Sequence, residues 1–367
     1  MADYTGYRYA VKQGLSGNVP LIVRGELCGS DCSCAKWIFA RRFSVSVAGR
    51  PAFSNGGSSG KMQPILVTGG AGFIGAHTCK ELAAHGFQPI AFDNLSRGHR
   101  DALQWGPFVQ GDIPKQDDLD CAFERYQPQS VIHFAVLAYV GESVEQPLTY
   151  YQNNVSGLIN VLDVMVRHGV DTIVFSSSCA TYGVPDVLPI AEEALQRPIS
   201  PYGHSKLMCE QILLHVATTY HLRISLLRYF NACGADPDGQ LSERHDPETH
   251  LIPLAVDAAS GRGPPLQIFG ADYPTGDGTC ERDFIHVSDL ARAHVAALNR
   301  PNNGCETLAL NLGTGRSYSI LEVVSAIERV TGHPVPVIRG PKQQETQQPS
   351  SPMLQRGAHA SFQAKIF

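Results

Sequence analysis

The sequence predicts an α/β fold, in which a parallel sheet is covered by helices on both faces and a smaller α/β domain follows. A short apolar run at residues 65–67 leads into glycines at positions 69, 72 and 75, and a helical pattern begins near residue 74. Apolar runs and helical patterns then alternate, which is the order of βαβ units. After residue 230 the pattern becomes irregular and rich in Pro and Gly, as expected of a smaller domain.

Length and composition are those of a globular protein with two domains. The chain has 367 residues, of which 43% are hydrophobic and 17% charged, so it can bury a large core. A net charge of −5 favours neither nucleic acid nor an anionic membrane as a partner. No apolar run approaches the roughly 20 residues of a membrane-spanning helix. The ten cysteines are scattered, which is typical of the reducing cytoplasm.

Residues 1–61 differ from the rest of the chain. They show no sustained periodicity, end in a flexible SNGGSSG linker, and contain an Arg- and Ser-rich stretch that faintly resembles an organelle transit peptide. We expect this N-terminal extension to be disordered or to serve targeting, and to be dispensable for fold and chemistry. Cys28, Cys32 and Cys34 have no second pair of ligands nearby, so the sequence predicts no metal site.

The glycines stand between a strand and a helix, the context in which such a loop binds a dinucleotide. Gly69 permits the tight turn, Gly72 lets the backbone approach a pyrophosphate, and Gly75 lets the helix pack on the strand. Asp93 ends the next apolar run at close to the expected spacing of about 20 residues. A carboxylate there binds an adenosine ribose and favours NAD over NADP. An ordinary glycine-rich turn is the alternative.

Ser178, Tyr202 and Lys206 form the predicted catalytic group. Ser178 closes a run of three serines after an apolar stretch, and Tyr202 and Lys206 lie on one face at the start of a helix. A neighbouring ammonium and a positive nicotinamide ring favour the phenolate and lower the pKa of the tyrosine, which can then act as a base. A chance or structural Tyr–Lys pair is the alternative.

Six motifs together resemble those of the extended short-chain dehydrogenase/reductases that modify nucleotide sugars and, among them, the UDP-glucose 4-epimerases. They are TGGAGFIG at 68–75, YVGESV at 139–144, SSS at 176–178, YGHSK at 202–206, LRYFN at 227–231 and GDGTCERDFIHV at 276–287. The resemblance covers about residues 62–340. Dehydratases of the superfamily carry a carboxylate after the catalytic Ser or Thr, whereas CAT follows Ser178 here, which argues against elimination.

The resemblance implies that C4 of a UDP-sugar is oxidised to a ketone and then reduced on its opposite face, with NAD bound throughout. Tyr202 would take the proton of the 4-OH. An NAD-binding domain of Rossmann type at residues 62–230 and a homodimer are also implied. Besides Gly69, Gly72, Gly75 and Asp93, the implied NAD contacts are Phe73, Ile74, Asn94, Asp112, Ile113, Phe134, Ala135, Asn153 and Phe230.

The same resemblance implies a substrate-binding part at residues 231–340, from which the chain returns to the sheet. The implied substrate contacts are Ser178, Asn231, His250, Leu251, Gln267, Phe269 and Arg282. Arg282 is the most informative, because its fork of donors suits a diphosphate; an ion pair with Asp283 or Asp289 is the alternative. Beyond residue 340 the family's second diphosphate-binding Arg has no counterpart. We therefore expect this domain to be incomplete and residues 341–367 to be disordered.

Two classes of function remain open at this stage. The catalytic group favours an active UDP-sugar 4-epimerase, which interconverts UDP-glucose and UDP-galactose. The incomplete substrate part favours a non-catalytic NAD-binding homologue. Among enzymes, 4-epimerisation of UDP-arabinose and UDP-xylose is a further alternative, since it uses the same motifs.

Overall fold

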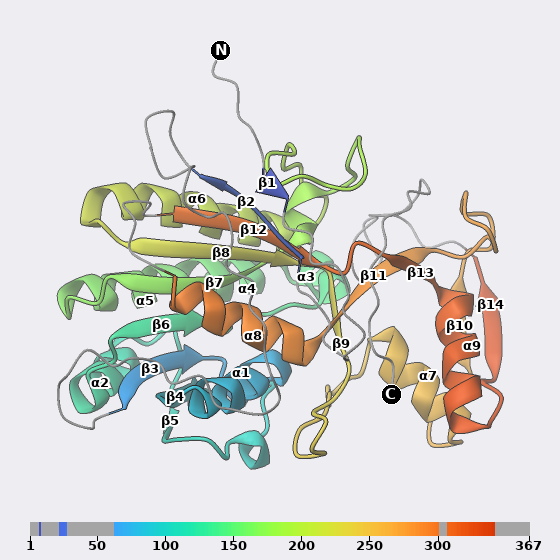
Figure 1. Ribbon diagram of the computed structural model, residues 1–367, viewed down its shortest axis with the longest axis horizontal. Helices are drawn as coiled ribbons and strands as arrows, with labels where there is room; N and C mark the ends of the chain where they lie inside the picture. Colours follow the sequence, from blue (N-terminus) through green and yellow to red (C-terminus); the bar gives the residue numbers. More distant parts are fainter. Residues whose placement is uncertain (1–6, 9–21, 28–61, 301–306, 342–367) are drawn as a thin grey trace.

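The computed structural model describes residues 62–300 and 307–341, together with the backbone of residues 7–8 and 22–27 (Figure 1). A large sheet with helices on both faces fills one side of the molecule, and a smaller domain lies at its end. The expectations for residues 1–61 and 341–367 fall almost entirely outside the described residues. Among the helices described, none has the length and apolar character needed to cross a membrane.

Seven parallel strands form the centre of the large sheet, in the order β12-β8-β7-β6-β3-β4-β5. This arrangement confirms the predicted doubly wound fold. The short N-terminal strands β1 (Tyr7–Arg8) and β2 (Ile22–Leu27) extend the sheet antiparallel beside β12. The parallel strands are β3 (Gln63–Thr68), β4 (Phe87–Asp93), β5 (Phe108–Gln110), β6 (Ser130–His133), β7 (Thr172–Ser178), β8 (Arg223–Tyr229) and β12 (Thr307–Gly313).

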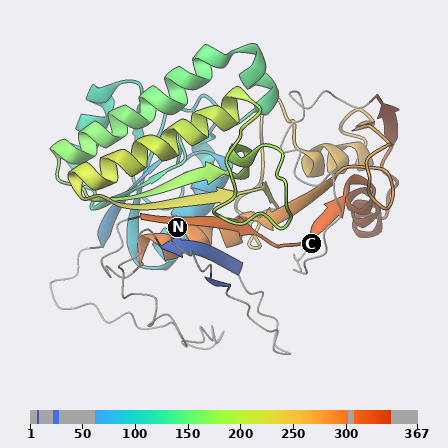
Figure 2. The ribbon, with the colours of Figure 1, turned by 90° about the horizontal axis from the view of Figure 1, so that it is seen from above.

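Helices cover both faces of this sheet, so its strands are apolar on both sides. Along β3, Leu66 packs into the core under one face, and Ile65 and Val67 pack into the core under the other. Figure 2 shows the two layers of helices on either side of the sheet. One layer holds α2 (Gln116–Tyr126), α5 (Gly157–Arg167) and α6 (Pro201–Tyr220), and the other holds α1 (Phe73–Ala84) and α8 (Val287–Leu298).

The apolar stripe at residues 148–168 predicts one continuous helix, and here the structure differs. A single turn, α4 (Pro147–Tyr150), passes into a π-helical segment (Tyr151–Ser156) before α5 begins. Inside this segment the buried Asn154 accepts a hydrogen bond from Leu137 N (2.8 Å) and donates to Leu137 O (3.0 Å). The wider turn therefore coincides with a side chain that anchors the loop after β6, and π-helical turns are often found at functional sites.

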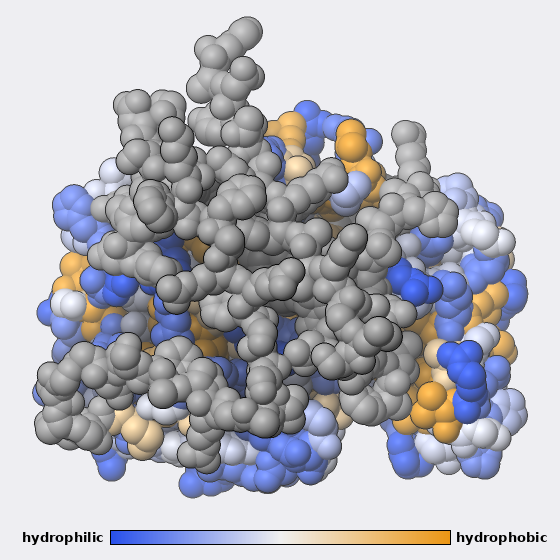
Figure 3. Space-filling view, in the orientation of Figure 1, coloured by the Kyte–Doolittle hydropathy of each residue, from blue (hydrophilic) through white to orange (hydrophobic). Residues whose placement is uncertain are grey.

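The smaller domain is built from short elements around a core of its own. Its helices α7 (Leu251–Ala259) and α9 (Ile320–Thr331) share this core with Phe284 and Leu266. Apolar atoms also reach the surface at this end of the molecule (Figure 3), where Val330 is exposed. Its strands are β9 (Asn231–Cys233), β11 (Glu281–His286) and β13 (Ser317–Ser319) in one sheet and β10 (Leu266–Phe269) and β14 (Val337–Gly340) in another.

Candidate active site

A cleft opens at the carboxyl ends of the parallel strands, between β3 and β6, where the strand order reverses. Ligands bind at this point in doubly wound sheets. Of the predicted NAD contacts, those that line the cleft are Gly69, Gly72, Asp93, Asn94, Asp112, Ile113, Phe134, Ala135 and Asn153. Phe73, Ile74 and Gly75 form the adjoining first turn of α1. Phe230 lies apart from them, packed beside Cys179 and Tyr182. The structure adds Phe92, Ser96, Arg97, Gly98, Gly111, Val136 and Leu137 to the lining.

The glycine loop has the shape of a phosphate cradle. Gly69 has a φ of +71°, and a Cβ there would lie 2.7 Å from Ala135 N. A Cβ on Gly75 would lie 2.2 Å from Gly69 O, so only glycine lets helix and loop approach this closely. Gly72 caps α1 without a side-chain hydrogen bond and lines the cleft. The free N–H groups of this helix start therefore suit an anionic pyrophosphate.

Asp93 is oriented by two backbone donors at the end of β4. Its Oδ2 accepts from Ala71 N at 3.0 Å and its Oδ1 from Leu95 N at 2.8 Å. Burial raises the pKa of this carboxyl, while the two backbone hydrogen bonds lower it. Beside it, Asn94 Nδ2 donates to Asp112 Oδ1 at 2.9 Å. The carboxylates of Asp93 and Asp112 are therefore held in place and present acceptors to the cleft, as a ribose diol requires.

Ser178 and Tyr202 meet where β7 ends and α6 begins. Ser200 caps α6 by accepting from Gly203 N at 3.2 Å, and Pro201 occupies the first turn, a favoured helix start. Tyr202 thus enters the helix near the end of β7, where its hydroxyl comes within hydrogen-bonding reach of Ser178. Ser178 Oγ also accepts from Ala180 N at 3.1 Å. The fold therefore brings the predicted serine and tyrosine together.

Lys206 lies one turn further along α6 and is fully buried. Its Nζ donates to Ser176 O at 2.6 Å and lies 5.9 Å from the centre of the Tyr202 ring. Burial lowers the pKa of Lys206 to about 8. Burial also raises the pKa of Tyr202 to about 12, and the hydrogen bond with Ser178 only partly opposes this. The sequence predicted a lowered pKa for Tyr202; in this structure desolvation of the phenolate raises it instead.

The model of the NAD dependent epimerase/dehydratase family matches residues 65–313, which include this cleft and all three catalytic candidates. The chain belongs to this family. The UDP-glucose 4-epimerase of Rhizobium meliloti (strain 1021) is 51% identical over 270 residues, which cover 74% of this chain and 82% of that protein. These matches confirm the resemblance inferred from the motifs.

Solved structures of the family have the same fold. The UDP-glucose 4-epimerase from Brucella ovis, in complex with NAD, is 53% identical with a TM-score of 0.76, covering 79% of this chain and 89% of that one. The enzyme from Stenotrophomonas maltophila, with bound NAD and formylated UDP-arabinopyranose, is 40% identical with a TM-score of 0.74, covering 78% and 88%.

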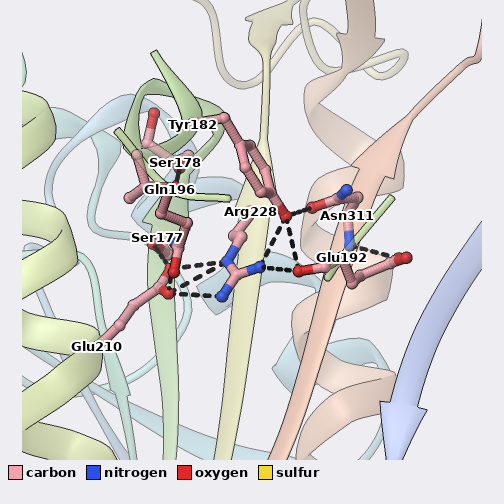
Figure 4. Close-up of polar contacts among 9 residues, drawn as sticks. Ser177, Ser178, Tyr182, Glu192, Gln196, Glu210, Arg228 and Asn311 are labelled. Carbon is pink, nitrogen blue, oxygen red and sulfur yellow. Dashed lines mark hydrogen bonds and ion pairs between the residues drawn. The ribbon is translucent and has the colours of Figure 1, made fainter. Parts of the chain in front are cut away.

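A buried network behind β7 was missed by the sequence analysis, although Arg228 stands in the LRYFN motif. Arg228, on β8, binds Glu210 of α6 through two nitrogens on one edge of its guanidinium. Nη2 donates to Oε2 at 2.7 Å and Nε to Oε1 at 2.9 Å (Figure 4). Glu210 also accepts from Ser177 Oγ at 2.5 Å. An arginine directly after the apolar pair at residues 226–227, and a Glu one turn after Lys206, were the available signals.

The same arginine reaches the other side of the site. Its Nη1 donates to Tyr182 OH at 2.6 Å and to Glu192 O at 3.0 Å, and Tyr182 OH donates to Asn311 Oδ1 on β12 at 2.8 Å. Arg228 therefore ties α6, the loop before it and three neighbouring strands together directly behind Ser178 (Figure 4). Glu210 lies on the same helix as Tyr202, but neither Tyr202 nor Ser178 is among the residues that line the NAD cleft.

The predicted substrate contacts are more dispersed than the catalytic ones. Asn231 donates to Asp283 O at 2.9 Å, and Arg282 Nη1 donates to Glu281 O at 3.0 Å. Within the described residues Arg282 forms no ion pair with Asp283, whose carboxylate accepts from residues 314 and 315. Gln267 and Phe269 lie on β10, and His250 and Leu251 lie at the start of α7. None of these six residues lines the NAD cleft.

Proposed function

We propose that this protein interconverts UDP-glucose and UDP-galactose by oxidation at C4 and reduction of the 4-ketone on its opposite face. The contact of Tyr202 with Ser178 at the end of β7, with Lys206 one turn behind, carries this proposal. A hydroxyl donor, a phenol and a buried ammonium beside a nucleotide cleft are the groups needed to move a proton as a hydride leaves a secondary alcohol.

The cleft provides the contacts for NAD. The first turn of α1 would hold the pyrophosphate, and Asp93 would accept from the adenosine ribose. When bound, NAD accepts the hydride from C4 and later returns it. The lining at Asp112 and Ile113 would enclose the adenine side.

The chain's own residues then control the proton. Tyr202 would accept the proton of the 4-OH through its phenolic oxygen and give it back on the reverse step. Ser178 would donate to the substrate oxygen as charge develops there. Lys206, whose pKa is about 8, keeps most of its positive charge at neutral pH and favours the phenolate electrostatically.

UDP would be held by the smaller domain. Arg282 is half-buried and donates only through Nη1 to a backbone carbonyl among the described residues. Its other donors suit a diphosphate, for which arginine is the preferred partner. Tight binding of UDP with loose binding of the sugar would let the 4-keto sugar turn between the two hydride transfers.

Incubation of the purified full chain with UDP-galactose, followed by chromatographic measurement of UDP-glucose, tests the proposal. We expect turnover without added oxidant, and turnover lowered by about 10²–10⁴-fold in the Tyr202→Phe variant. Bound NAD without turnover in the wild type would instead select the non-catalytic alternative.

A second candidate is 4-epimerisation of UDP-arabinose and UDP-xylose, favoured by the bound UDP-arabinopyranose derivative in the Stenotrophomonas maltophila structure. Comparing kcat/KM for UDP-galactose and UDP-arabinose on one preparation separates the two. We also propose a cytoplasmic homodimer, on the basis of the family resemblance. Elution as a monomer at micromolar concentration in gel filtration would contradict the homodimer.

A further inference from the structure

Four side chains converge in the loop between β9 and α7. Glu243, His245, Glu248 and His250 come from a single stretch of chain with the spacing Glu-x-His-x-x-Glu-x-His. One ligating atom from each lies within 4.8 Å of the other three. The NAD cleft does not include them, and the proposed catalytic steps do not use them together.

The distances within the cluster are those between ligands that share one metal ion. His250 Nδ1 lies 3.1 Å from Glu243 Oε1 and 3.0 Å from Glu248 Oε1. His245 Nδ1 lies 3.4 Å from Glu243 Oε1 and 3.5 Å from Glu248 Oε2. Zinc bonds of about 2.0–2.1 Å in a tetrahedron separate neighbouring ligand atoms by roughly 3.3 Å. The four contacts between nitrogen and oxygen lie close to this value.

The two carboxylates are largely buried and need a positive charge beside them, which a protonated histidine or a bound cation can supply. The side chain of Glu243 is only 7% exposed and that of Glu248 16%, and the ion pairs described for both carboxylates are with the two histidines. His245 Nδ1 is buried and lacks a hydrogen-bond partner of good geometry in the described part of the chain. Buried carboxylates and an unsatisfied nitrogen directed at one point suit a shared cation.

The surroundings hold the ligands in place. Glu248 Oε1 accepts from the backbone N–H groups of Thr249 and His250, each at 2.8 Å, which orients the carboxylate. Arg97 Nη1 donates to Asp246 O at 3.1 Å and steadies the loop from the nucleotide domain. A cavity of about 830 Å³, lined by Glu243, His245 and Glu248, gives an ion access from solvent.

We propose that Glu243, His245, Glu248 and His250 bind one divalent transition-metal ion of the zinc class. Two imidazoles and two carboxylates favour Zn²⁺ over Mg²⁺ or Ca²⁺, which prefer all-oxygen ligands. The ring of His245 lies 6.3 Å from that of Phe73 at the start of α1 and 6.0 Å from that of Tyr139. A bound ion would therefore stiffen the substrate-domain loop where it meets the nucleotide domain. This site does not depend on the proposed epimerase activity.

Cobalt titration of tag-free, chelator-treated full chain tests the site, because tetrahedral Co²⁺ absorbs visible light strongly. We expect one equivalent to bind, to be displaced by one equivalent of Zn²⁺, and to lose at least 10-fold in affinity in Glu243→Gln and His245→Asn. His215→Asn, at an exposed position on α6, is the matched control and should bind as the wild type does.

A measurement on the wild type alone guards against variants that misfold. Zn²⁺ should slow diethyl pyrocarbonate modification of His245 and His250, read by mass spectrometry of the peptide that contains them, but not modification of His215. Any of three results would overturn the proposal. The wild type could fail to bind the ion, the His215→Asn control could lose as much affinity as the cluster variants, or the modification rates could fail to respond to Zn²⁺. If both cluster variants still bound the ion with wild-type affinity, the ion would be adventitious, and this result would also overturn the proposal.

Discussion

The two halves of the molecule hold their functional groups in different ways. In the nucleotide half, the glycine loop, Asp93 and Asp112 come from different strands yet line one cleft, because the carboxyl ends of parallel strands meet at one edge of the sheet. In the smaller domain, Asn231, Gln267 and Arg282 lie on β9, β10 and β11, and β10 belongs to a separate sheet. Motifs therefore locate a site well where one sheet brings them together and poorly where they are spread over two small sheets.

The anchoring of the side chains differs in the same sense. Lys206 and Arg228 are almost fully buried and make short contacts inside the sheet–helix layer. The side chain of His250 is 43% exposed, and Arg282 holds a neighbouring carbonyl. We infer that the nucleotide half is preorganised for chemistry, whereas the smaller domain is adjusted by what it binds.

Removing the phenol should produce the largest functional effect. Tyr202→Phe should lower kcat by about 10²–10⁴-fold, the usual contribution of general acid–base catalysis, measured as UDP-glucose formed from UDP-galactose. Bound NAD and the thermal midpoint should stay close to those of the wild type, because the ring still packs in place. A wild-type kcat in the Tyr202→Phe variant would contradict the assignment of Tyr202 as the group that moves the proton.

Breaking the buried ion pair should have the largest effect on stability. Arg228→Met leaves Glu210 charged and only 2% exposed, which should lower the free energy of unfolding by about 3–5 kcal/mol in urea titrations. Arg223→Met on the same strand is the control, since its partner Asp171 is exposed and such pairs contribute about 0–1 kcal/mol. Equal losses of unfolding free energy in the two variants would mean that the buried network stabilises the protein no more than an exposed ion pair does.

Replacing the buried lysine should stabilise the protein while it abolishes turnover. Burial lowers the pKa of Lys206 from 10.5 to about 8, so the folded state carries a charge that it disfavours at neutral pH. At 1.36 kcal/mol per pKa unit, Lys206→Met should gain up to about 3 kcal/mol at pH 7.

The sign of this pH dependence follows from linkage. Between pH 8 and 10.5 the unfolded wild type binds more protons at this lysine than the folded one, so wild-type stability rises with pH and the advantage of Lys206→Met shrinks. Urea titrations of both proteins at pH 7 and pH 10 measure the difference. An advantage that is constant with pH would contradict the assignment of the shifted pKa to Lys206.

The smallest expected effect concerns the substrate half. Arg282→Gln should raise KM for UDP-galactose about 10-fold with little change in kcat, since a hydrogen bond from a charged group is worth about 1.5–3 kcal/mol and 1.4 kcal/mol is tenfold. Arg262→Gln, whose side chain is 66% exposed and paired with Asp257, is the control. A fall in kcat with unchanged KM would mean that Arg282 acts in the chemical step.

Much of the nucleotide half could be predicted because its signals are local. The spacing of Gly69, Gly72 and Gly75 follows from a single turn, and Tyr202 and Lys206 share a face through helix geometry alone. The π-helical turn at Asn154 could not be predicted in this way. It depends on two hydrogen bonds to Leu137, distant in sequence, and the apolar stripe around it is equally compatible with a regular helix.

The amino-acid order alone therefore specifies the doubly wound sheet and the dinucleotide loop and proposes the catalytic group, because periodicity and short spacings encode them. Packing alone decides that Arg228 links Glu210 to Tyr182 and that burial sets opposite pKa shifts on Tyr202 and Lys206. Packing also decides that two glutamates and two histidines of one loop converge on a point. Desolvation depends on which distant surfaces meet, and no local pattern in the chain records that. The convergence of the four side chains depends on how their loop folds.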